Sequence, residues 1–248
     1  MSDFVRPANS KEVPVLDLGP LIQGGDINAL AAQLDQACRN TGFFYVSNHG
    51  VSENARNAIF GATRRYFALP EEVRKRDLMD PFFRRGFMPQ GNTQQPGYAA
   101  DLKESYEIGV DLPFDDPDVV ARRPFYAPNK WPAELPWLKE ASDDYFRQVT
   151  ELGVKLLRLI ARALDLQDDF FIQYIKKPMF QMRLFHYPIQ EGEVDGKGVG
   201  AAPHTDFGMI TVLAPDPIGG LEIRKKDGEW ITAPYIDGTF VVNIGDLF

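Results

Sequence analysis

Apolar residues recur at intervals of three and four along three stretches of the chain, and this period predicts amphipathic helices. One helix is expected from Ile27 to Cys38, with Gly42 after its end as a C-cap. A second is expected from the N-cap Ser52 to Ala68, and a third, with the strongest apolar stripe, from Ser142 to Leu164. A short helix is expected around residues 168–175.

Short apolar or alternating runs predict strands, and most of them lie late in the chain. Residues 80–136 have little periodicity and are expected to be irregular loops around one strand. The expected strands are residues 13–18, 43–46, 104–110, 180–187, 209–214, 221–224, 230–232 and 239–244. Helices in the first part and closely spaced strands in the last favour an α+β fold over an alternating βαβ fold.

Composition narrows the class of protein. The chain has 248 residues, 27 basic and 35 acidic side chains and a net charge of −8, which disfavours a nucleic-acid partner that needs a basic patch. It has no apolar run near the roughly 20 residues that span a bilayer, so we expect no membrane partner. Its start is unlike a signal peptide and its single cysteine is Cys38, so we expect a cytoplasmic protein. The oligomeric state stays open.

Common nucleotide and nucleophile motifs do not occur in the sequence, and the candidate chemistry lies in Pro203–Gly208. Residues two apart on a strand point to one face, so His204 and Asp206 could offer a nitrogen and an oxygen to a common point. They would form two thirds of the facial triad of non-haem Fe(II) enzymes. With three histidines and 35 acidic residues, an incidental pair on a strand is the alternative.

Several segments together resemble, in order, the isopenicillin N synthase-like family of Fe(II)/2-oxoglutarate-dependent oxygenases, from about Val13 to the last residue. The matching segments are Val13–Leu18, Gly42–Gly50, Met182–Pro188, His204–Asp206, Gly219–Ile223 and Val241–Asp246. The resemblance implies a double-stranded β-helix, or jelly roll, with N-terminal helices packed on it. It places the N-terminal helical region at residues 1–174 and the first part of the core at residues 175–248.

The resemblance also implies a chemistry and a set of site residues. His204 and Asp206 would be iron ligands, and Tyr187 would hydrogen-bond the co-substrate 2-oxoglutarate. The implied oxidoreductase oxidises a small-molecule substrate with O₂, in the first place by hydroxylation, and releases succinate and CO₂. Ascorbate is an auxiliary reductant in such reactions.

Alternation along residues 180–187 places Gln181, Arg183, Phe185 and Tyr187 on one face of a strand. A polar face of this kind suits a barrel interior that binds a dianion. Arg183 matches a substrate-proximal position in relatives, and a purely structural arginine is an equal alternative. Phe185 stands where many plant relatives have an asparagine that helps to hold the co-substrate. It is therefore a substrate-side candidate, and the co-substrate contacts stay open.

The remaining two histidines, His49 and His186, are expected to have structural or supporting roles. The family also needs a second histidine ligand and an Arg-x-Ser that grips 2-oxoglutarate, and neither follows His204. We therefore expect a C-terminally truncated chain with an incomplete core and little or no activity of its own. The alternatives are an oxidase that does not use 2-oxoglutarate, an ethylene- or succinate-forming enzyme of this fold, and a non-catalytic binding protein.

Overall fold

The computed structural model describes residues 5–189 and 200–248. The chain divides into two compact units, which we describe separately. The first unit comprises residues 1–51, 148–176 and 205–248, and the second comprises residues 52–147 and 177–204. Helices and mostly antiparallel strands occur in both, which agrees with the predicted α+β class.

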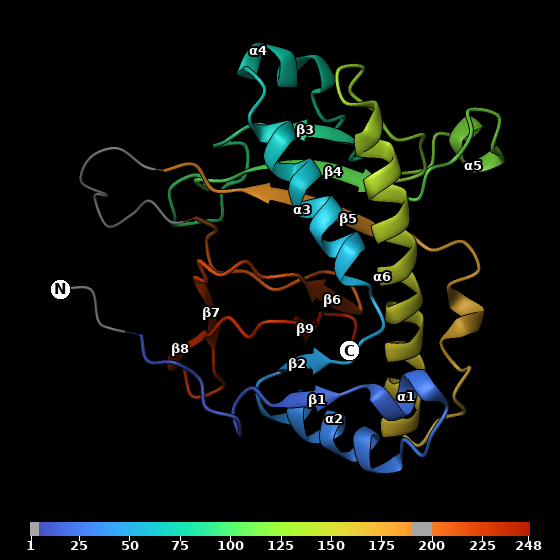
Figure 1. Ribbon diagram of the computed structural model, residues 1–248, viewed down its shortest axis with the longest axis vertical. Helices are drawn as coiled ribbons and strands as arrows, with labels where there is room; N and C mark the ends of the chain where they lie inside the picture. Colours follow the sequence, from blue (N-terminus) through green and yellow to red (C-terminus); the bar gives the residue numbers. More distant parts are fainter. Residues whose placement is uncertain (1–4, 190–199) are drawn as a thin grey trace. The chain divides into compact units, whose positions relative to one another are not determined.

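A four-stranded sheet in the order β1-β2-β9-β6 organises the first unit (Figure 1). Its strands are β1 (Val15–Asp17), β2 (Phe43–Ser47), β9 (Phe240–Ile244) and β6 (Ile210–Leu213). β1 runs parallel to β2, and the other neighbours are antiparallel. The three middle residues of β2 are buried, as expected for a continuous apolar run in a central strand.

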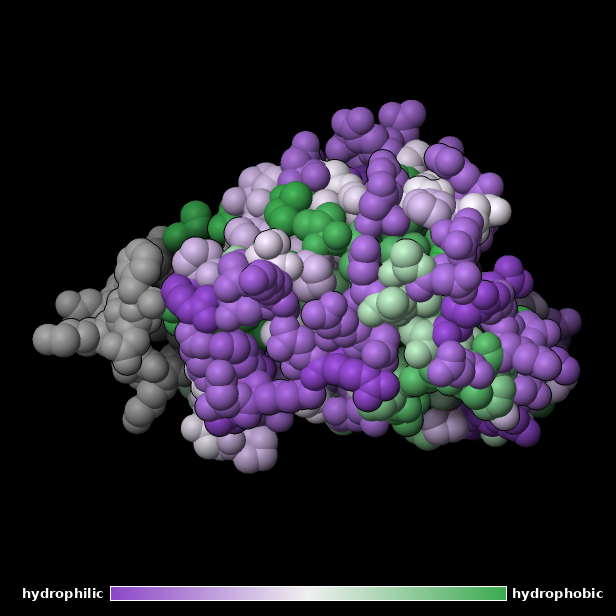
Figure 2. All heavy atoms as spheres, turned by 90° about the horizontal axis from the view of Figure 1, so that it is seen from below, coloured by the Kyte–Doolittle hydropathy of each residue, from purple (hydrophilic) through white to green (hydrophobic). Residues whose placement is uncertain are grey.

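Helix α2 (Asn28–Asn40) packs on β1 and β2 and follows the short helix α1 (Gly19–Gln23). It confirms the helix predicted from the spacing of apolar residues. Gly42 has a φ of +77° and donates a backbone hydrogen bond to Ala37, so it ends the helix as predicted. Hydrophilic residues predominate on the face drawn in Figure 2, beside smaller groups of apolar ones.

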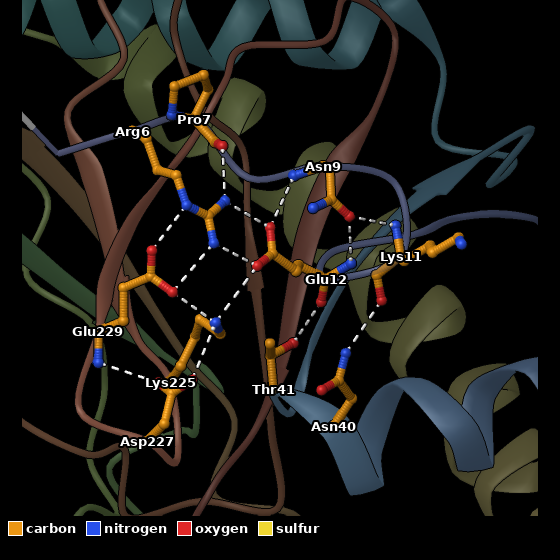
Figure 3. Close-up of polar contacts among 10 residues, drawn as sticks. All are labelled: Arg6, Pro7, Asn9, Lys11, Glu12, Asn40, Thr41, Lys225, Asp227 and Glu229. Carbon is orange, nitrogen blue, oxygen red and sulfur yellow. Dashed lines mark hydrogen bonds and ion pairs between the residues drawn. The ribbon is translucent and has the colours of Figure 1, made fainter.

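The N-terminal segment adds to a hairpin in the same unit. β7 (Leu221–Arg224) pairs with β8 (Trp230–Ala233), and residues on both sides of Pro7 exchange backbone hydrogen bonds with Thr232. An ion network that we call the N-terminal clasp fixes this contact (Figure 3). Arg6 bridges Glu12 and Glu229, and Lys225 pairs with both of these carboxylates and with Asp227.

The second unit contains a three-stranded antiparallel sheet in the order β3-β4-β5. Its strands are β3 (Gly86–Met88), β4 (Glu104–Gly109) and β5 (Gln181–His186), and every residue of β4 is buried. Helix α3 (Glu53–Phe67) packs on β5 and begins where the hydroxyl of Ser52 accepts a hydrogen bond from the backbone of Ala55. Three shorter helices complete the region: α4 (Glu71–Arg74), η1 (Lys75–Asp77) and α5 (Pro117–Val120).

Three expectations need correction. Helix α6 (Pro136–Ala163) begins before Ser142, because a proline suits the first turn and the buried Leu138 already packs there. Residues 80–136 include β3 and α5 besides the predicted strand β4. The expected helix at 168–175 is a run of turns with only a 3-10 helix, η2 (Ile172–Tyr174).

Among the described residues, no helix is long and apolar enough to cross a bilayer.

Candidate metal and co-substrate site

The His204-Thr205-Asp206 motif lies in an irregular segment that ends where β6 begins, so its expected place on a strand is wrong. Isolated backbone hydrogen bonds hold this segment in place of a strand ladder. The N–H of Gly245 donates to the carbonyl of Met209, and the N–H of Asp246 donates to the carbonyl of Asp206. His204 belongs to the second unit and Asp206 to the first. We therefore describe each among its own neighbours.

Two neighbouring strands hold the carboxylate of Asp206. The hydroxyl of Thr211 on β6 donates to Oδ2 over 2.6 Å, and Nδ2 of Asn243 on β9 donates to the same oxygen over 2.8 Å. Thr211 and Asn243 are register partners in the antiparallel ladder, so their side chains reach this oxygen side by side. Two donors on one oxygen fix the rotation of the carboxylate, as expected for the outer partners of a metal ligand.

The backbone around Asp206 is held as tightly as its side chain. Asp246 donates its N–H to the carbonyl of Asp206 over 2.8 Å, and its carboxylate accepts from the Thr205 hydroxyl over 2.9 Å. Gly245 lies so close that a Cβ atom there would be 2.7 Å from the carbonyl oxygen of Asp206 and even closer to that of Gly208. This close backbone approach requires glycine.

A buried carboxylate in the second unit orients His204 through one residue, Ala202. Nδ1 of His204 lies 2.8 Å from the carbonyl oxygen of Ala202, which can only accept, so Nδ1 carries the proton and Nε2 the lone pair. The N–H of Ala202 donates to Asp101 over 2.9 Å, and Asp101, only 3% exposed, pairs with Lys103. A histidine with its Nδ1 proton on a carbonyl is a typical metal ligand through Nε2.

The other predicted site residues lie on or beside β5. Tyr187 follows the strand, is 54% exposed, and lies with its ring against Gly200 and 6.3 Å from the ring of Phe185. Arg183 donates from Nε to the buried carboxylate of Glu107 over 3.0 Å. The second unit thus contains all three of these predicted residues.

The two remaining histidines have structural partners. His49 is buried, accepts a hydrogen bond from the backbone of Val51, and lies 4.3 Å from the ring of Phe240. His186 donates to Glu104 over 2.8 Å and stacks on Phe67. These contacts agree with the roles expected for both.

The donor types suit iron, and the described residues supply part of a ligand set. Nitrogen from His204 and oxygen from Asp206 belong to the set that non-haem Fe(II) prefers. In the described ranges, no group of three or more His, Cys, Asp or Glu side chains is placed to hold a metal ion. The chain therefore offers two candidate ligands, each oriented by its own hydrogen bonds.

Sequence reasoning did not assign the residues that orient these ligands: Thr211, Asn243 and Asp101. Asn243 gave one signal, since it is a polar residue at the end of a run that is otherwise typical of a buried strand. Such a residue needs a buried partner. Its partner could not be named without the pairing of β6 with β9.

Comparison with known proteins gave matches over most of the chain. Residues 13–134 match the family "non-haem dioxygenase in morphine synthesis N-terminal", and residues 178–248 match the "2OG-Fe(II) oxygenase superfamily". Kihadalactone A synthase LFS of Citrus sinensis is 38% identical over 255 residues, which are 96% of this chain and 74% of that protein. The 2-oxoglutarate-dependent dioxygenase citB of Monascus ruber is 35% identical, over 98% of this chain and 77% of its own length.

A solved structure shares the fold. A full-length protein of Neurospora crassa, crystallised in complex with alpha-KG, aligns with a TM-score of 0.84 and 30% identity. The alignment covers 97% of this chain and 75% of that one. The helices and strands described above are therefore arranged in the same fold as in that protein.

Proposed function

Because this chain belongs to the 2OG-Fe(II) oxygenase superfamily and is a 2-oxoglutarate-dependent dioxygenase, we propose that it hydroxylates a small organic molecule. Its fold is the α+β jelly roll of that family, and its cofactors are Fe(II) and 2-oxoglutarate. O₂ and a small-molecule substrate complete the reaction, which would release succinate and CO₂. We further propose that residues 1–174 support the core and that residues 175–248 form its first part.

The arrangement around Asp206 carries this proposal. A carboxylate held on one oxygen by both Thr211 and Asn243 is positioned as a ligand rather than as a solvated surface acid. Asp206 and Nε2 of His204 would hold Fe(II). The bound metal would supply the redox chemistry that couples oxidation of 2-oxoglutarate by O₂ to oxidation of the substrate.

Side chains on β5 and directly after it would bind the organic reactants. The phenol of Tyr187 can donate a hydrogen bond to a carboxylate of 2-oxoglutarate. Arg183 and Phe185, on the same face of the strand, would contact the substrate through charge and through apolar area. This assignment follows the alternation along β5 and the resemblance to relatives.

We also propose that this chain by itself has little activity. His49 and His186 are engaged with the partners described above, so neither is a candidate for the second histidine of a facial triad. Loss of supporting contacts alone costs about 10–100-fold in metal affinity or activity, and loss of a ligand should cost at least as much. The cytoplasmic location and the absence of a nucleic-acid partner stay predictions.

The test is an assay of the full-length gene product with Fe(II), ascorbate and 2-oxoglutarate. Release of succinate that depends on O₂ and rises with a panel of small molecules is the expected result. Substrate oxidation without succinate would indicate an oxidase that does not use 2-oxoglutarate. No succinate and no affinity for Fe(II) would indicate a non-catalytic binding protein.

A further inference from the structure

The last pair of the β4–β5 ladder carries a polar contact on the side of the sheet that faces α3. Glu104 begins β4 and His186 ends β5, and the two are register partners. Nδ1 of His186 lies 2.8 Å from Oε1 of Glu104. The imidazole also stacks on Phe67 of α3, with the ring centroids 5.1 Å apart. A side-chain hydrogen bond and a ring contact thus hold the end of β5.

The carboxylate of Glu104 has one partner on each oxygen. Its second oxygen, Oε2, forms an ion pair with Arg74, the last residue of α4. The two side chains of this pair are only 8% and 11% exposed. An ionised carboxylate can only accept hydrogen bonds, so Nδ1 of His186 carries the proton. We call these three residues the Arg74–Glu104–His186 chain.

Packing alone does not require charged groups at this place, because their surroundings are aromatic. The guanidinium of Arg74 lies 5.8 Å from the ring centre of Phe67 and 5.0 Å from that of Phe87. The buried ring of Tyr66 lies against both phenylalanines. Replacement of a buried ion pair by apolar residues of similar volume is often neutral or stabilising. A requirement for a fixed position of the imidazole therefore explains the chain better than stability does.

The residue that depends on this position is Tyr187, which directly follows His186. It lies on the other side of the strand, since its ring is 6.3 Å from that of Phe185, two residues before it. Tyr187 is 54% exposed, so burial contributes little to holding it. Pro188 has no N–H with which to extend the ladder. The direction of the phenol accordingly depends on the strand end that precedes it.

We infer that His186 is a positioning residue of the co-substrate site, held by Glu104 and Arg74, and that it acts by directing the hydroxyl of Tyr187. This inference rests on the proposed contact of Tyr187 with 2-oxoglutarate and adds residues from the opposite face of the sheet. A hydrogen bond weakens steeply when its angle is poor, so a small rotation of the phenol is enough to lose the contact.

The experiment measures binding rather than turnover. 2-Oxoglutarate is titrated anaerobically into the full-length gene product with Fe(II) present, and the visible charge-transfer band of the chelate reports its affinity. His186→Phe keeps a ring for Phe67 but has no donor for Glu104. We expect it to lower the affinity about tenfold, as does the loss of a hydrogen bond to a charged group. His186→Asn places an amide nitrogen near the position of Nδ1 and should recover most of the affinity.

A double-mutant cycle shows whether His186 acts through Tyr187. Without the phenol hydroxyl there is nothing left to direct, so Tyr187→Phe and the double variant with His186→Phe should bind 2-oxoglutarate equally well. A merely structural histidine would instead weaken the double variant further.

A second pair of substitutions separates position from stability. The double variant Arg74→Leu/Glu104→Leu removes the buried ion pair and the acceptor of His186 together. It should be at least as stable as wild type in thermal unfolding, yet bind 2-oxoglutarate about tenfold more weakly. Arg76→Leu/Glu134→Leu is the matched control, because it removes an exposed ion pair of the same unit and should leave the affinity unchanged.

Two results would overturn the inference and leave the proposed function standing. One is an unchanged affinity in His186→Phe or in the double leucine variant. The other is a loss in His186→Phe that His186→Asn does not recover, or that adds in full to the loss in Tyr187→Phe. Absence of 2-oxoglutarate binding in wild type would instead contradict the proposed function, and the inference with it.

Discussion

Thr211 and Asn243 lie opposite each other on β6 and β9, and both donate to Oδ2 of Asp206. The register of a β-ladder thereby fixes the rotation of a candidate metal ligand. The two strands are short and pair through buried apolar residues such as Val242, so packing of the sheet keeps both donors in place. This relationship connects the strand pattern of the sequence to the chemistry of the site.

Removal of either donor should weaken metal binding. We expect Thr211→Val and Asn243→Ala each to lower the affinity of the full-length gene product for Fe(II) by about 10–100-fold, because the carboxylate loses a partner that orients it. Anaerobic calorimetry measures this affinity. Thr63→Val is the control. It removes a hydroxyl that donates a hydrogen bond to a backbone carbonyl inside α3, and it should change the affinity for Fe(II) little. Equal affinities for all variants would show that these donors do not position Asp206.

A methyl group at residue 245 should disturb the segment that carries Asp206. A Cβ atom there meets backbone carbonyl oxygens of Asp206 and Gly208, which cannot rotate away. We expect Gly245→Ala to lower the free energy of unfolding by about 1–3 kcal/mol, as overpacking does. Gly61→Ala in α3 has open space for its methyl group and should be neutral or raise stability. Thermal unfolding followed by circular dichroism compares them, and similar Tm values would contradict the close approach at Gly245.

Asp101 should affect metal binding through Ala202. Asp101→Asn keeps an oxygen that can accept from the N–H of Ala202, whereas Asp101→Ala does not, and both remove the ion pair with Lys103. Both variants should therefore lose the stabilisation of that ion pair, and Asp101→Ala should lose more, because it also leaves the buried N–H of Ala202 without its acceptor. Only Asp101→Ala should lose about tenfold or more in Fe(II) affinity, because only there is His204 no longer oriented. Identical affinities for the two variants would argue against this path.

The N-terminal clasp should make the protein sensitive to acid. Hydrogen bonds from Arg6, with a further one from the backbone of Asn9, lower the pKa of Glu12 from 4.5 to about 2. A lowered pKa means that folding favours the ionised carboxylate, so this stabilisation is complete above pH 4.5 and is lost as the pH falls toward 2.

Arg6→Ala should accordingly flatten the loss of stability over that range of pH, and salt should have a similar effect on wild type. Tm measured against pH gives the result. Arg39→Ala removes an exposed pair within α2 and serves as the control, with an acid limb like that of wild type. If Arg6→Ala and wild type have acid limbs of the same steepness, the clasp does not stabilise the fold.

Local patterns predicted the local elements well. Ser52 marked the start of α3 because a serine hydroxyl at the N-cap accepts a hydrogen bond from the first turn of a helix. The run Phe43–Val46 predicted β2. The start of α6 was missed because Leu138 lies among Lys139 and Glu140, so the apolar stripe is recognisable only further along. Alternation along β5 placed Arg183 and Phe185 on one face, which agrees with their partners across the ladder.

Long-range pairing was beyond these patterns. The parallel contact of β1 with β2 and the contact of β6 with β9 depend on which strands pack together, and no local period encodes that choice. Asn243 is 37 residues from Asp206, so its role appears only in the folded sheet. The ligand candidates themselves were identified by motif and resemblance, and their orientation by the structure.

The most direct test of the central claim is an anaerobic titration of Fe(II) into the full-length gene product with 2-oxoglutarate present, followed in the visible spectrum. The chelated complex should give a charge-transfer band that Asp206→Ala abolishes. Asp216→Ala, which changes an exposed acid of the same unit, should keep the band. No band in wild type, or an undiminished band in Asp206→Ala, would contradict the assignment of Asp206 as an iron ligand.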